Sequence, residues 1–362
     1  MLLSRVAWRD FRNIGQATIE PDPGLNVLWG DNAQGKTNLL EGIHLLGNLK
    51  SFRQGPNEAI VRHGSERATV GAELSFRGVQ RSIDLTIDGR GKTTRVDRKT
   101  VRTAKDFLGV LKTVLFSPEE VNLVKGYPGG RRSLVDRAVF QIDPSFLERA
   151  QDYSRCLKQR NRLLKNGCSQ AELDSWTEEL VRTGARIRQD RYLYLAGLRP
   201  LLEEAYLNLT GNKERANLLY PAGNDDEQAL CETLKRRLER DSERERQLRQ
   251  TLSGPHRDDF DFMVNGLSLR LYGSQGQQRS FMLAFKTAQI MDLEAKLGEA
   301  PVLLLDDMTG ELDRQRQGFF FRFLLGRRGQ VFVTTTDIQP LLNEGLDHAR
   351  FFRVVGGSLE TE

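Results

Sequence analysis

The feature that most constrains this chain is the segment at residues 30–37, which reads G-D-N-A-Q-G-K-T and matches G-x-x-x-x-G-K-[ST] in full. An apolar segment at residues 25–29 precedes it, and residues 36–49 have helical spacing. A strand, a glycine-rich turn and a helix in this order are the context in which the pattern forms a phosphate-binding P-loop. A chance glycine-rich turn before Lys and Thr is the alternative, which the flanking strand and helix disfavour.

Each part of this segment has a chemical role in binding a nucleotide. Gly30 and Gly35 let the backbone curl so that its N–H groups converge on phosphate oxygens. The following helix directs its positive dipole end at the same anion. Lys36 is expected to reach the β and γ phosphates, and the Thr37 hydroxyl to help hold Mg²⁺. The sequence therefore predicts ATP and Mg²⁺ as cofactors, with these nucleotide-binding residues: Gly30, Asp31, Asn32, Ala33, Gln34, Gly35, Lys36 and Thr37.

A second apolar segment, at residues 302–306, ends in two carboxylates, Asp306 and Asp307. In P-loop NTPases an acidic residue at such a strand end holds Mg²⁺. We assign this role to Asp306, and we expect Asp307 to orient or deprotonate the attacking water as a catalytic residue beside Lys36. A strand capped by two solvated carboxylates is the alternative, and the P-loop in the same chain disfavours it.

Residues 272–279 read Y-G-S-Q-G-Q-Q-R and precede an apolar helical segment. Serine is a good helix N-cap, and Gly276 allows close backbone approach to an anion. An S-x-G-Q cluster before a helix, followed by a D-D strand, resembles the order in ABC-type ATPases. In that class the cluster binds the γ-phosphate of a nucleotide held by the other subunit. The resemblance implies that two copies enclose two ATP molecules, with these further contacts: Ser274, Gln275, Gly276 and Gln277. A helix cap alone is the alternative.

Further matches point to one branch of that class. They are D-F-R-N at residues 10–13, G-K-T-N-L-L-E at 35–41, G-P-H-R-D-D at 254–259, and L-D-D at 305–307 followed by E-L-D at 311–313. Together they resemble the RecF family, on the SMC-like, DNA-acting side of the ABC class, from end to end of the chain. The resemblance implies that Arg12, Asn13 and Asn38 contact the nucleotide. It also places Glu311, Leu312 and Asp313 along the dimer seam.

The same resemblance implies a function. Two copies joined by ATP would bind duplex DNA near gaps, and hydrolysis would release it. RecR and RecO would be partners, and RecA loading the outcome.

Departures from the ABC pattern predict slow hydrolysis. Gln275 stands where transporters usually have glycine, and Asp307 replaces the commoner glutamate. The segment T-T-T-D at residues 334–337 stands where many ABC proteins have a switch histidine, and F-S-P-E at 116–119 is near the place of the usual glutamine between lobes. These groups position the attacking water, so their loss should slow the reaction.

The periodicity of apolar residues along the chain changes twice. Residues 1–115 alternate in the manner of strands, residues 116–253 are helical, and strand–helix alternation returns over 254–362. This predicts an α/β fold: an ABC-type P-loop ATPase head, residues 1–115 and 254–362, split by a helical lid insertion, residues 116–253. Within the head we expect strands at residues 70–76, 83–87, 93–101, 260–264, 267–272 and 331–335, and helices at 277–297 and 312–325; within the lid we expect helices at 146–164, 173–207 and 228–252. His256 is either a hinge contact between lid and core or an ordinary hydrogen-bonded histidine.

The net charge of +5, from 54 Lys and Arg against 49 Asp and Glu, permits a polyanionic partner without requiring one. A solvated sheet edge or ion-paired helix faces would explain the basic clusters equally well. DNA as a partner therefore rests on the resemblance. The candidate phosphate contacts are Arg90, Lys92, Arg95, Arg98, Lys99, Arg102, Arg131, Arg132, Arg155, Lys158, Arg160, Arg162 and Lys165.

Three widely spaced cysteines, no long apolar run and a charged N-terminus predict a cytoplasmic protein without a membrane span. Two other functions stay open. One is the ATPase subunit of an ABC transporter. The other is a DNA-binding module that ATP only stabilises, without functional hydrolysis.

Overall fold

The chain divides into two compact units in a computed structural model that describes residues 1–53, 55–221, 226–307, 318–319, 322–324, 326–327, 329–343 and 349–361. The first unit comprises Met1–Asn122, Asn208–Gly211 and Met282–Glu362, and the second Leu123–Leu207 and Asn212–Phe281. We describe each by itself. The sequence had led us to expect residues 254–281 in the head, whereas they pack here with the helices of the second unit; the domain boundaries stay a prediction.

One sheet of the first unit is antiparallel, in the order β2-β1-β4-β5-β6-β7. The strands expected at residues 70–76 and 83–87 are confirmed, and they form hairpins in which Phe76 pairs with Val79 and Asp88 with Gly91. The strand expected over residues 93–101 is divided by a turn at Asp97, where two consecutive left-handed residues reverse the chain. The strands are β1 (Leu2–Phe11), β2 (Ile14–Ile19), β4 (Arg67–Phe76), β5 (Val79–Asp88), β6 (Gly91–Val96) and β7 (Lys99–Thr100).

The other sheet of this unit has the order β15-β14-β3-β13-β12-β8 and is parallel from β14 to β8. Its strands are β3 (Leu25–Trp29), β8 (Thr113–Phe116), β12 (Val302–Asp306), β13 (Val331–Thr335), β14 (Arg350–Val355) and β15 (Ser358–Thr361). The strands predicted at residues 25–29, 302–306 and 331–335 are confirmed. Because parallel strands end at a common edge, the residues after β3, β12 and β13 meet there.

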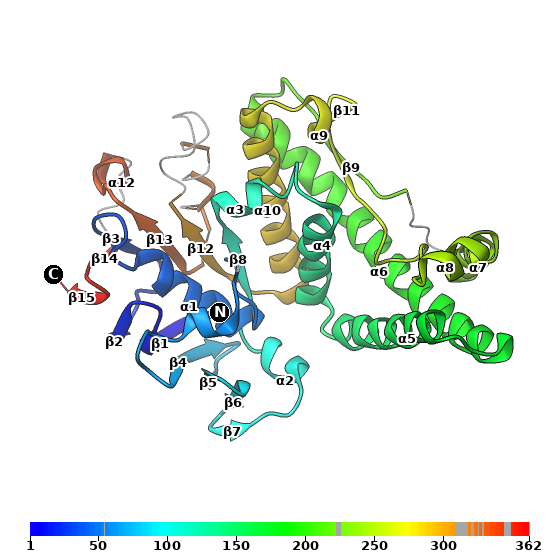
Figure 1. The fold of residues 1–362 in the computed structure, drawn as a ribbon. Coiled ribbons are helices and arrows are strands. Elements are labelled where there is room, and N and C mark those ends of the chain that lie inside the picture. Colours follow the sequence, from blue (N-terminus) through cyan, green and yellow to red (C-terminus); the bar gives the residue numbers. More distant parts are fainter. Residues whose placement is uncertain are drawn as a thin grey trace. The chain divides into compact units, whose positions relative to one another are not determined.

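Helix α1 (Lys36–Asn48) packs against strands of both sheets, β1, β4 and β5 on one side and β8, β12 and β13 on the other (Figure 1). Ten of its 13 residues are buried, as expected for a helix between two layers. A Cβ on Gly42 would lie 2.1 Å from Trp8 Nε1, so only glycine permits this approach. The P-loop before α1 therefore stands on a closely packed support. Short helices complete the unit: η1 (Asn57–Ile60), α2 (Ala104–Leu108), α3 (Pro118–Val121) and α12 (Gln339–Asn343).

The second unit is mainly helical. Its elements are α4 (Pro128–Ile142), α5 (Phe146–Asn166), α6 (Gln170–Thr210), α7 (Glu227–Arg240), α8 (Ser242–Leu248), α9 (Leu269–Tyr272), α10 (Gln275–Leu297) and a sheet of β9 (Ala216–Leu219), β10 (Asp261–Val264) and β11 (Leu267–Ser268). Both α6 and α10 have residues in each unit. In the part of the chain that the structure describes, every helix is too short or too polar to cross a membrane.

Three expectations for this unit were wrong in detail. The helical region includes strand β9, which forms because Ala216 and its neighbours pair with β10. The helix expected over residues 228–252 is interrupted at Asp241 and ends at Leu248, before the left-handed Arg249. The strand expected over residues 267–272 becomes a helical turn after Ser268, although its apolar residues alternate as in a strand. The helix expected at residues 312–325 lies mostly outside the described residues.

Several charged side chains are buried among the apolar residues of the second unit. Asp258 accepts hydrogen bonds from Arg188, at 2.9 and 2.6 Å, and from the Tyr220 hydroxyl at 2.6 Å. Two candidate DNA contacts are also buried: Arg131, 2% exposed, pairs with Asp259, and Arg160, 3% exposed, pairs with Glu245. Arg131 and Arg160 therefore stabilise this unit, and the expectation that they contact DNA was wrong.

His256 belongs to the same interior and predicts a pH dependence of stability. Its Nδ1 lies 2.5 Å from the Tyr153 hydroxyl and its Nε2 3.2 Å from the Thr251 carbonyl oxygen. Because a carbonyl only accepts, Nε2 must carry a hydrogen, and at neutral pH the lowered pKa of His256 leaves Nδ1 without one. Burial lowers the pKa of His256 from 6.5 to about 4. Below pH 6.5 the unfolded chain binds the extra proton more readily, so stability should fall as pH drops toward 4.

Thermal unfolding of wild type, His256→Gln and the exposed control His63→Gln at neutral and mildly acidic pH measures this effect. We expect the melting temperature of His256→Gln to fall less on acidification than that of the other two proteins. Equal falls for all three would show that His256 binds the extra proton equally well in the folded and the unfolded chain, against this account.

Candidate nucleotide-binding site

The P-loop backbone depends on its two glycines. Gly30 and Gly35, with φ of 145° and 113°, have conformations that other residues rarely adopt. A Cβ on Gly30 would lie 2.5 Å from the Val354 carbonyl oxygen, and one on Gly35 2.8 Å from Asn13 Oδ1. Both positions therefore require glycine for conformation and for close packing.

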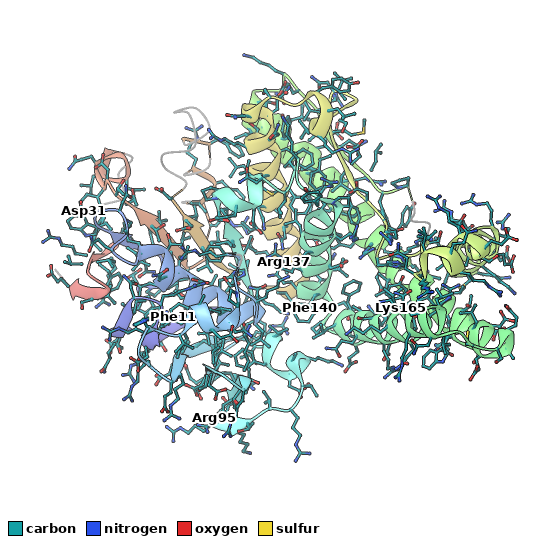
Figure 2. The ribbon with its side chains drawn as sticks, in the orientation of Figure 1. Phe11, Asp31, Arg95, Arg137, Phe140 and Lys165 are labelled. Carbon is teal, nitrogen blue, oxygen red and sulfur yellow. The ribbon has the colours of Figure 1, made fainter. Side chains whose placement is uncertain are left out.

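Lys36 folds back over the loop. Its Nζ donates hydrogen bonds of 2.7 Å to the carbonyl oxygens of Gly30 and Asp31. Burial lowers the pKa of Lys36, while the charges of Asp307, Asp31 and Asp306 oppose this shift. Asp31 lies exposed on the same loop (Figure 2). Phosphate oxygens are stronger acceptors than carbonyl oxygens, so a bound nucleotide could replace these two contacts.

The P-loop and the acidic strand end meet at one hydrogen bond. Thr37 Oγ1 donates to Asp306 Oδ1 at 2.8 Å, and Thr334 Oγ1 donates to the same oxygen at 2.8 Å. Asp306 is only 4% exposed. Burial raises the pKa of this carboxyl, the two hydroxyl hydrogen bonds lower it, and the charges of Glu119 and Asp307 raise it. A hydroxyl beside a carboxylate is an oxygen donor set that suits Mg²⁺.

Asp307 is exposed and has a left-handed backbone, with φ of 47°. Its N–H donates to Thr334 Oγ1 at 2.9 Å, so Thr334 binds both aspartates. The sequence analysis placed Thr334 in the segment that stands in place of a switch histidine, but did not predict its hydrogen bonds to the two aspartates. The signal that could have found it is a hydroxyl on an otherwise apolar strand, at the register position that pairs with Asp306.

Arg12 uses its donors inside the protein. Its Nε and Nη2 donate to Glu41 at 3.0 and 2.6 Å, and its Nη1 donates to the Ala59 carbonyl oxygen at 2.7 Å. Glu41 is fully buried. Asn13 and Asn38 are joined by a hydrogen bond of 2.7 Å, and Asn13 Nδ2 also donates to the Gln34 carbonyl oxygen at 3.2 Å. The asparagines therefore support the P-loop, and direct nucleotide contact by Arg12, Asn13 and Asn38 stays a prediction.

A cavity of about 760 Å³ opens beside these residues. Arg12, Asn13 and Asn38 line it, together with three residues that sequence reasoning missed: Arg53, Arg62 and His63. Arg53 Nη1 donates to Asn38 Oδ1 at 2.7 Å. These three come from connecting segments without a motif, so no sequence pattern marked them. Three carboxylates, Glu58, Glu66 and Asp88, also line this cavity, so its basic and acidic side chains are balanced and its charge alone does not mark it as a phosphate site.

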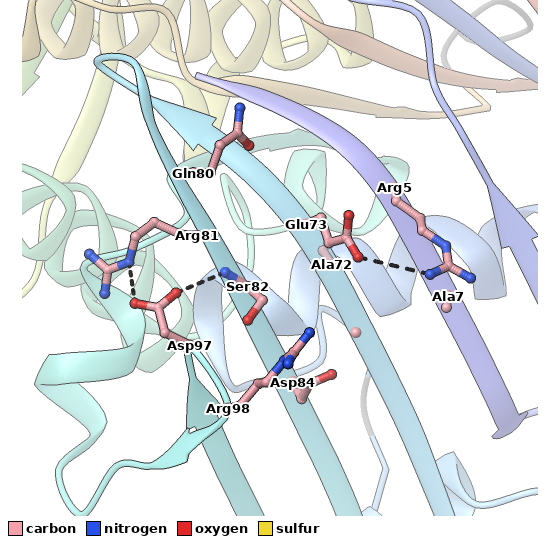
Figure 3. Close-up of a pocket in the computed structure, with 11 residues that line it drawn as sticks. Arg5, Ala7, Ala72, Glu73, Gln80, Arg81, Ser82, Asp84, Asp97 and Arg98 are labelled. Carbon is pink, nitrogen blue, oxygen red and sulfur yellow. Dashed lines mark hydrogen bonds and ion pairs between the residues drawn. The ribbon is translucent and has the colours of Figure 1, made fainter.

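A different cavity, of about 600 Å³, lies on strands β1, β4 and β5 and the turn after β6 (Figure 3). Its charged groups largely bind one another. Arg81 pairs with Asp97 at 2.7 Å, and the Ser82 N–H donates to the same carboxylate at 3.0 Å. It contains no P-loop residue, and its paired charges leave little affinity for a phosphate.

The S-x-G-Q cluster forms a capping box at the start of α10, in the second unit. The Gln277 N–H donates to Ser274 Oγ at 3.1 Å, and the Ser274 N–H donates to Gln277 Oε1 at 3.0 Å. Gln277 Nε2 also donates to Glu214 at 2.8 Å. Ser274 and Gln275 are exposed, and Gly276 is half-buried. These hydrogen bonds confirm that the cluster caps helix α10. Its contact with a partner's nucleotide stays a prediction. Glu311, Leu312 and Asp313 lie outside the described residues.

Lys92, one of the candidate DNA contacts, instead stabilises α1. Its Nζ donates to the Leu49 carbonyl oxygen at 2.6 Å, where a cation complements the helix dipole. Burial, with a smaller effect of Lys50, lowers the pKa of Lys92. Arg95 lies exposed on the same sheet (Figure 2).

A P-loop before a helix between two sheets, an acidic strand end bound to its threonine, and a capped S-x-G-Q helix define the class of ABC-type ATPase heads. Residues 2–354 match the family described as RecF/RecN/SMC N terminal domain. The chain belongs to the RecF family within this SMC-like class.

The chain is similar to known RecF proteins over almost its whole length. It is 50% identical to the DNA replication and repair protein RecF of Syntrophotalea carbinolica, covering 99% of each chain, and 41% identical to that of Geotalea uraniireducens, covering 99% of this chain and 100% of that one. A solved structure of the recombination mediator protein RecF with ATP has a TM-score of 0.90 at 32% identity, covering 100% of this chain and 99% of that one. An Smc head from Pyrococcus furiosus, at 14% identity and a TM-score of 0.56, with 99% of this chain and 95% of that one covered, shares the fold.

Proposed function

We propose that this protein is an ATP-gated recombination mediator. ATP and Mg²⁺ join two copies into a dimer, and this dimer binds duplex DNA near gaps. Slow ATP hydrolysis then releases the DNA. RecR and RecO are the partners, and RecA loading is the outcome. The observation that carries the proposal is the hydrogen bond between Thr37 and Asp306, which unites the P-loop with the acidic strand end. We also propose a head of residues 1–115 and 254–362 with a lid of residues 116–253. Three free cysteines support action in the reducing cytoplasm.

Each residue of the nucleotide site in the first unit would have its own role. Lys36 would exchange its two carbonyl contacts for β- and γ-phosphate oxygens. Thr37 and Asp306 would hold Mg²⁺, which supplies charge neutralisation for the phosphates when bound. Asp307, exposed beside this pair, would orient the attacking water. Asp307 is one methylene shorter than glutamate, and the segment at residues 334–337 has threonines and an aspartate in place of a switch histidine. Both departures support a slow reaction.

The seam between two copies would contain Ser274, Gln275, Gly276 and Gln277 of one copy and the nucleotide of the other. Exposed apolar side chains directly before this cluster support the assignment. Leu267, Leu271 and Tyr272 are 57, 65 and 69% exposed. Grouped exposed apolar side chains are typical of surfaces that a protein partner covers.

DNA binding is supported by basic residues along one face of α5. Arg155, Lys158, Arg162 and Lys165 are exposed and spaced at three and four residues, which places them in one row. Figure 2 labels Lys165, near the end of this helix. Arg155 also pairs with the exposed Asp152 at 2.9 Å, a contact that solvent screens. Such a row suits a duplex phosphate backbone, with affinity that falls as salt rises and little dependence on base sequence.

Binding of a fluorescent gapped duplex tests the proposal. We expect ATP to increase DNA affinity about tenfold over ADP or no nucleotide, a usual size for coupling between two sites. Leu271→Ser should lose this increase, because it weakens the seam. Leu193→Ser, at a side chain 54% exposed on α6, should keep it.

Two other outcomes favour the alternatives. Equal DNA affinity in all nucleotide states would favour a module that ATP only stabilises. No DNA binding, together with co-purification of a membrane subunit, would favour a transporter ATPase, which the full-length similarity to RecF disfavours.

A further inference from the structure

We infer that the turn between β14 and β15, at Gly356 and Gly357, is part of the nucleotide site because it holds Gln34 and sets the P-loop in its phosphate-binding form. The inference rests on the proposal that this P-loop binds ATP. It concerns Gln34 as a positioning residue and assigns it no contact with the reacting atoms.

Two hydrogen bonds join the turn to Gln34. The Gly356 N–H donates to Gln34 Oε1 at 2.6 Å, and the Gly357 N–H donates to the Gln34 carbonyl oxygen at 2.8 Å. The middle of the P-loop is therefore fixed through both a side chain and the backbone, by residues more than 300 positions away in the sequence.

The turn can make these bonds because of its unusual backbone. Gly356 and Gly357 have φ of 56° and 80°, and the flanking Val355 and Ser358 pair across the hairpin. Two consecutive residues of positive φ are typical of the tightest hairpin turns. A Cβ on Gly357 would lie 2.5 Å from the Asn13 carbonyl oxygen, whereas one on Gly356 would meet nothing within 4 Å. The turn thus lies against Asn13 with its second glycine.

The hairpin also contacts the start of the P-loop. Strand β14 pairs with β3, the strand that leads into the loop, and Arg353 lies opposite Trp29. The Val354 carbonyl oxygen occupies the space beside Gly30 where a side chain would begin. The loop is therefore held at its first glycine and again at Gln34.

This support should matter for affinity. A P-loop must point several N–H dipoles at one place, an arrangement that a free loop would leave when no anion is bound. Holding it in that form before binding lowers the entropy cost of binding. Because ATP and ADP both present a β-phosphate to the loop, loss of the support should weaken both equally. A group that contacts only the γ-phosphate would affect ATP alone.

Nucleotide affinity of two variants tests the inference in the full-length protein. Gln34→Met removes the Oε1 acceptor at similar size, and we expect the dissociation constants of ATP and ADP to rise together, about three- to tenfold, as for one lost hydrogen bond. Gly357→Asn keeps the N–H and a residue that tolerates positive φ, but its Cβ would push the turn away from Asn13, with the same expected rise.

Gly78→Asn is the matched control, because Gly78 has a φ of 75° in the turn between β4 and β5 and a Cβ there would have open space, so this variant should keep wild-type affinity. Melting temperatures without nucleotide check the fold: Gly357→Asn should melt at a lower temperature because of its clash, whereas Gln34→Met adds no clash and should melt close to wild type. Unchanged affinities in both Gln34→Met and Gly357→Asn, or a loss for ATP only, would overturn the inference. A wild type that binds no ATP would instead overturn the proposed function.

Discussion

A Lys36→Met variant is expected to bind ATP about 100-fold more weakly than the wild type. The Nζ of Lys36 is held over the loop by two carbonyl oxygens, where it can meet two phosphates. Hydrogen bonds to charged groups contribute about 1.5–3 kcal/mol each, so losing two of them amounts to a factor of this size or more. Methionine keeps the length and the apolar stem, so the fold should persist.

Calorimetric titration with ATP measures this effect. Lys50→Met is the control, because it removes the same charge from an exposed site just after α1 and should bind ATP normally. ATP should raise the melting temperature of the wild type and of Lys50→Met but not of Lys36→Met, since a ligand stabilises only the protein that binds it. If Lys36→Met binds ATP with an affinity within about threefold of wild type, the loss is smaller than one lost hydrogen bond would cause. That result would show that Lys36 does not contact the phosphates.

An Asp307→Asn variant is expected to hydrolyse ATP at least about 100-fold more slowly, the usual contribution of a positioned acid–base group. Its ATP affinity should stay close to wild type, because Thr37, Asp306 and Lys36 remain in place. Asparagine has the size of aspartate but cannot accept the proton of the attacking water. The dimer should therefore stay joined with ATP and hold DNA longer.

Steady-state phosphate release and DNA dissociation measure the two effects. Asp174→Asn is the control, because it makes the same substitution at an exposed aspartate on α6, outside the nucleotide site, and should hydrolyse ATP at a near-normal rate. An Asp307→Asn protein with the wild-type rate would remove Asp307 from the chemistry. Unchanged DNA dissociation would favour a module without functional hydrolysis.

The local parts of this fold could be predicted from the sequence because each has its own pattern. The P-loop, the strands Leu25–Trp29 and Val302–Asp306, and the capped helix α10 all depend on neighbours within a few residues. Contacts made across the chain could not be predicted in this way. Thr334 reaches Asp306 only through the parallel register of β12 and β13.

The elements that the sequence predicted wrongly also depend on contacts across the chain. Strand β9 lies within a helical region because it pairs with β10, far along the chain. The leucines after Ser268 alternate as in a strand, but a helical turn buries Leu269 and exposes Leu271. Arg131 and Arg160 resemble free surface charge in the sequence, and only the fold brings Asp259 and Glu245 to them.

Sedimentation of the wild-type protein with and without ATP tests the central claim most directly, which is that ATP joins two copies. The chain has a mass of 41.2 kDa. We expect that mass without nucleotide and twice that mass with ATP, while Lys36→Met stays at the single mass under both conditions. A wild type that binds ATP yet keeps the single mass at every ATP concentration would contradict the account.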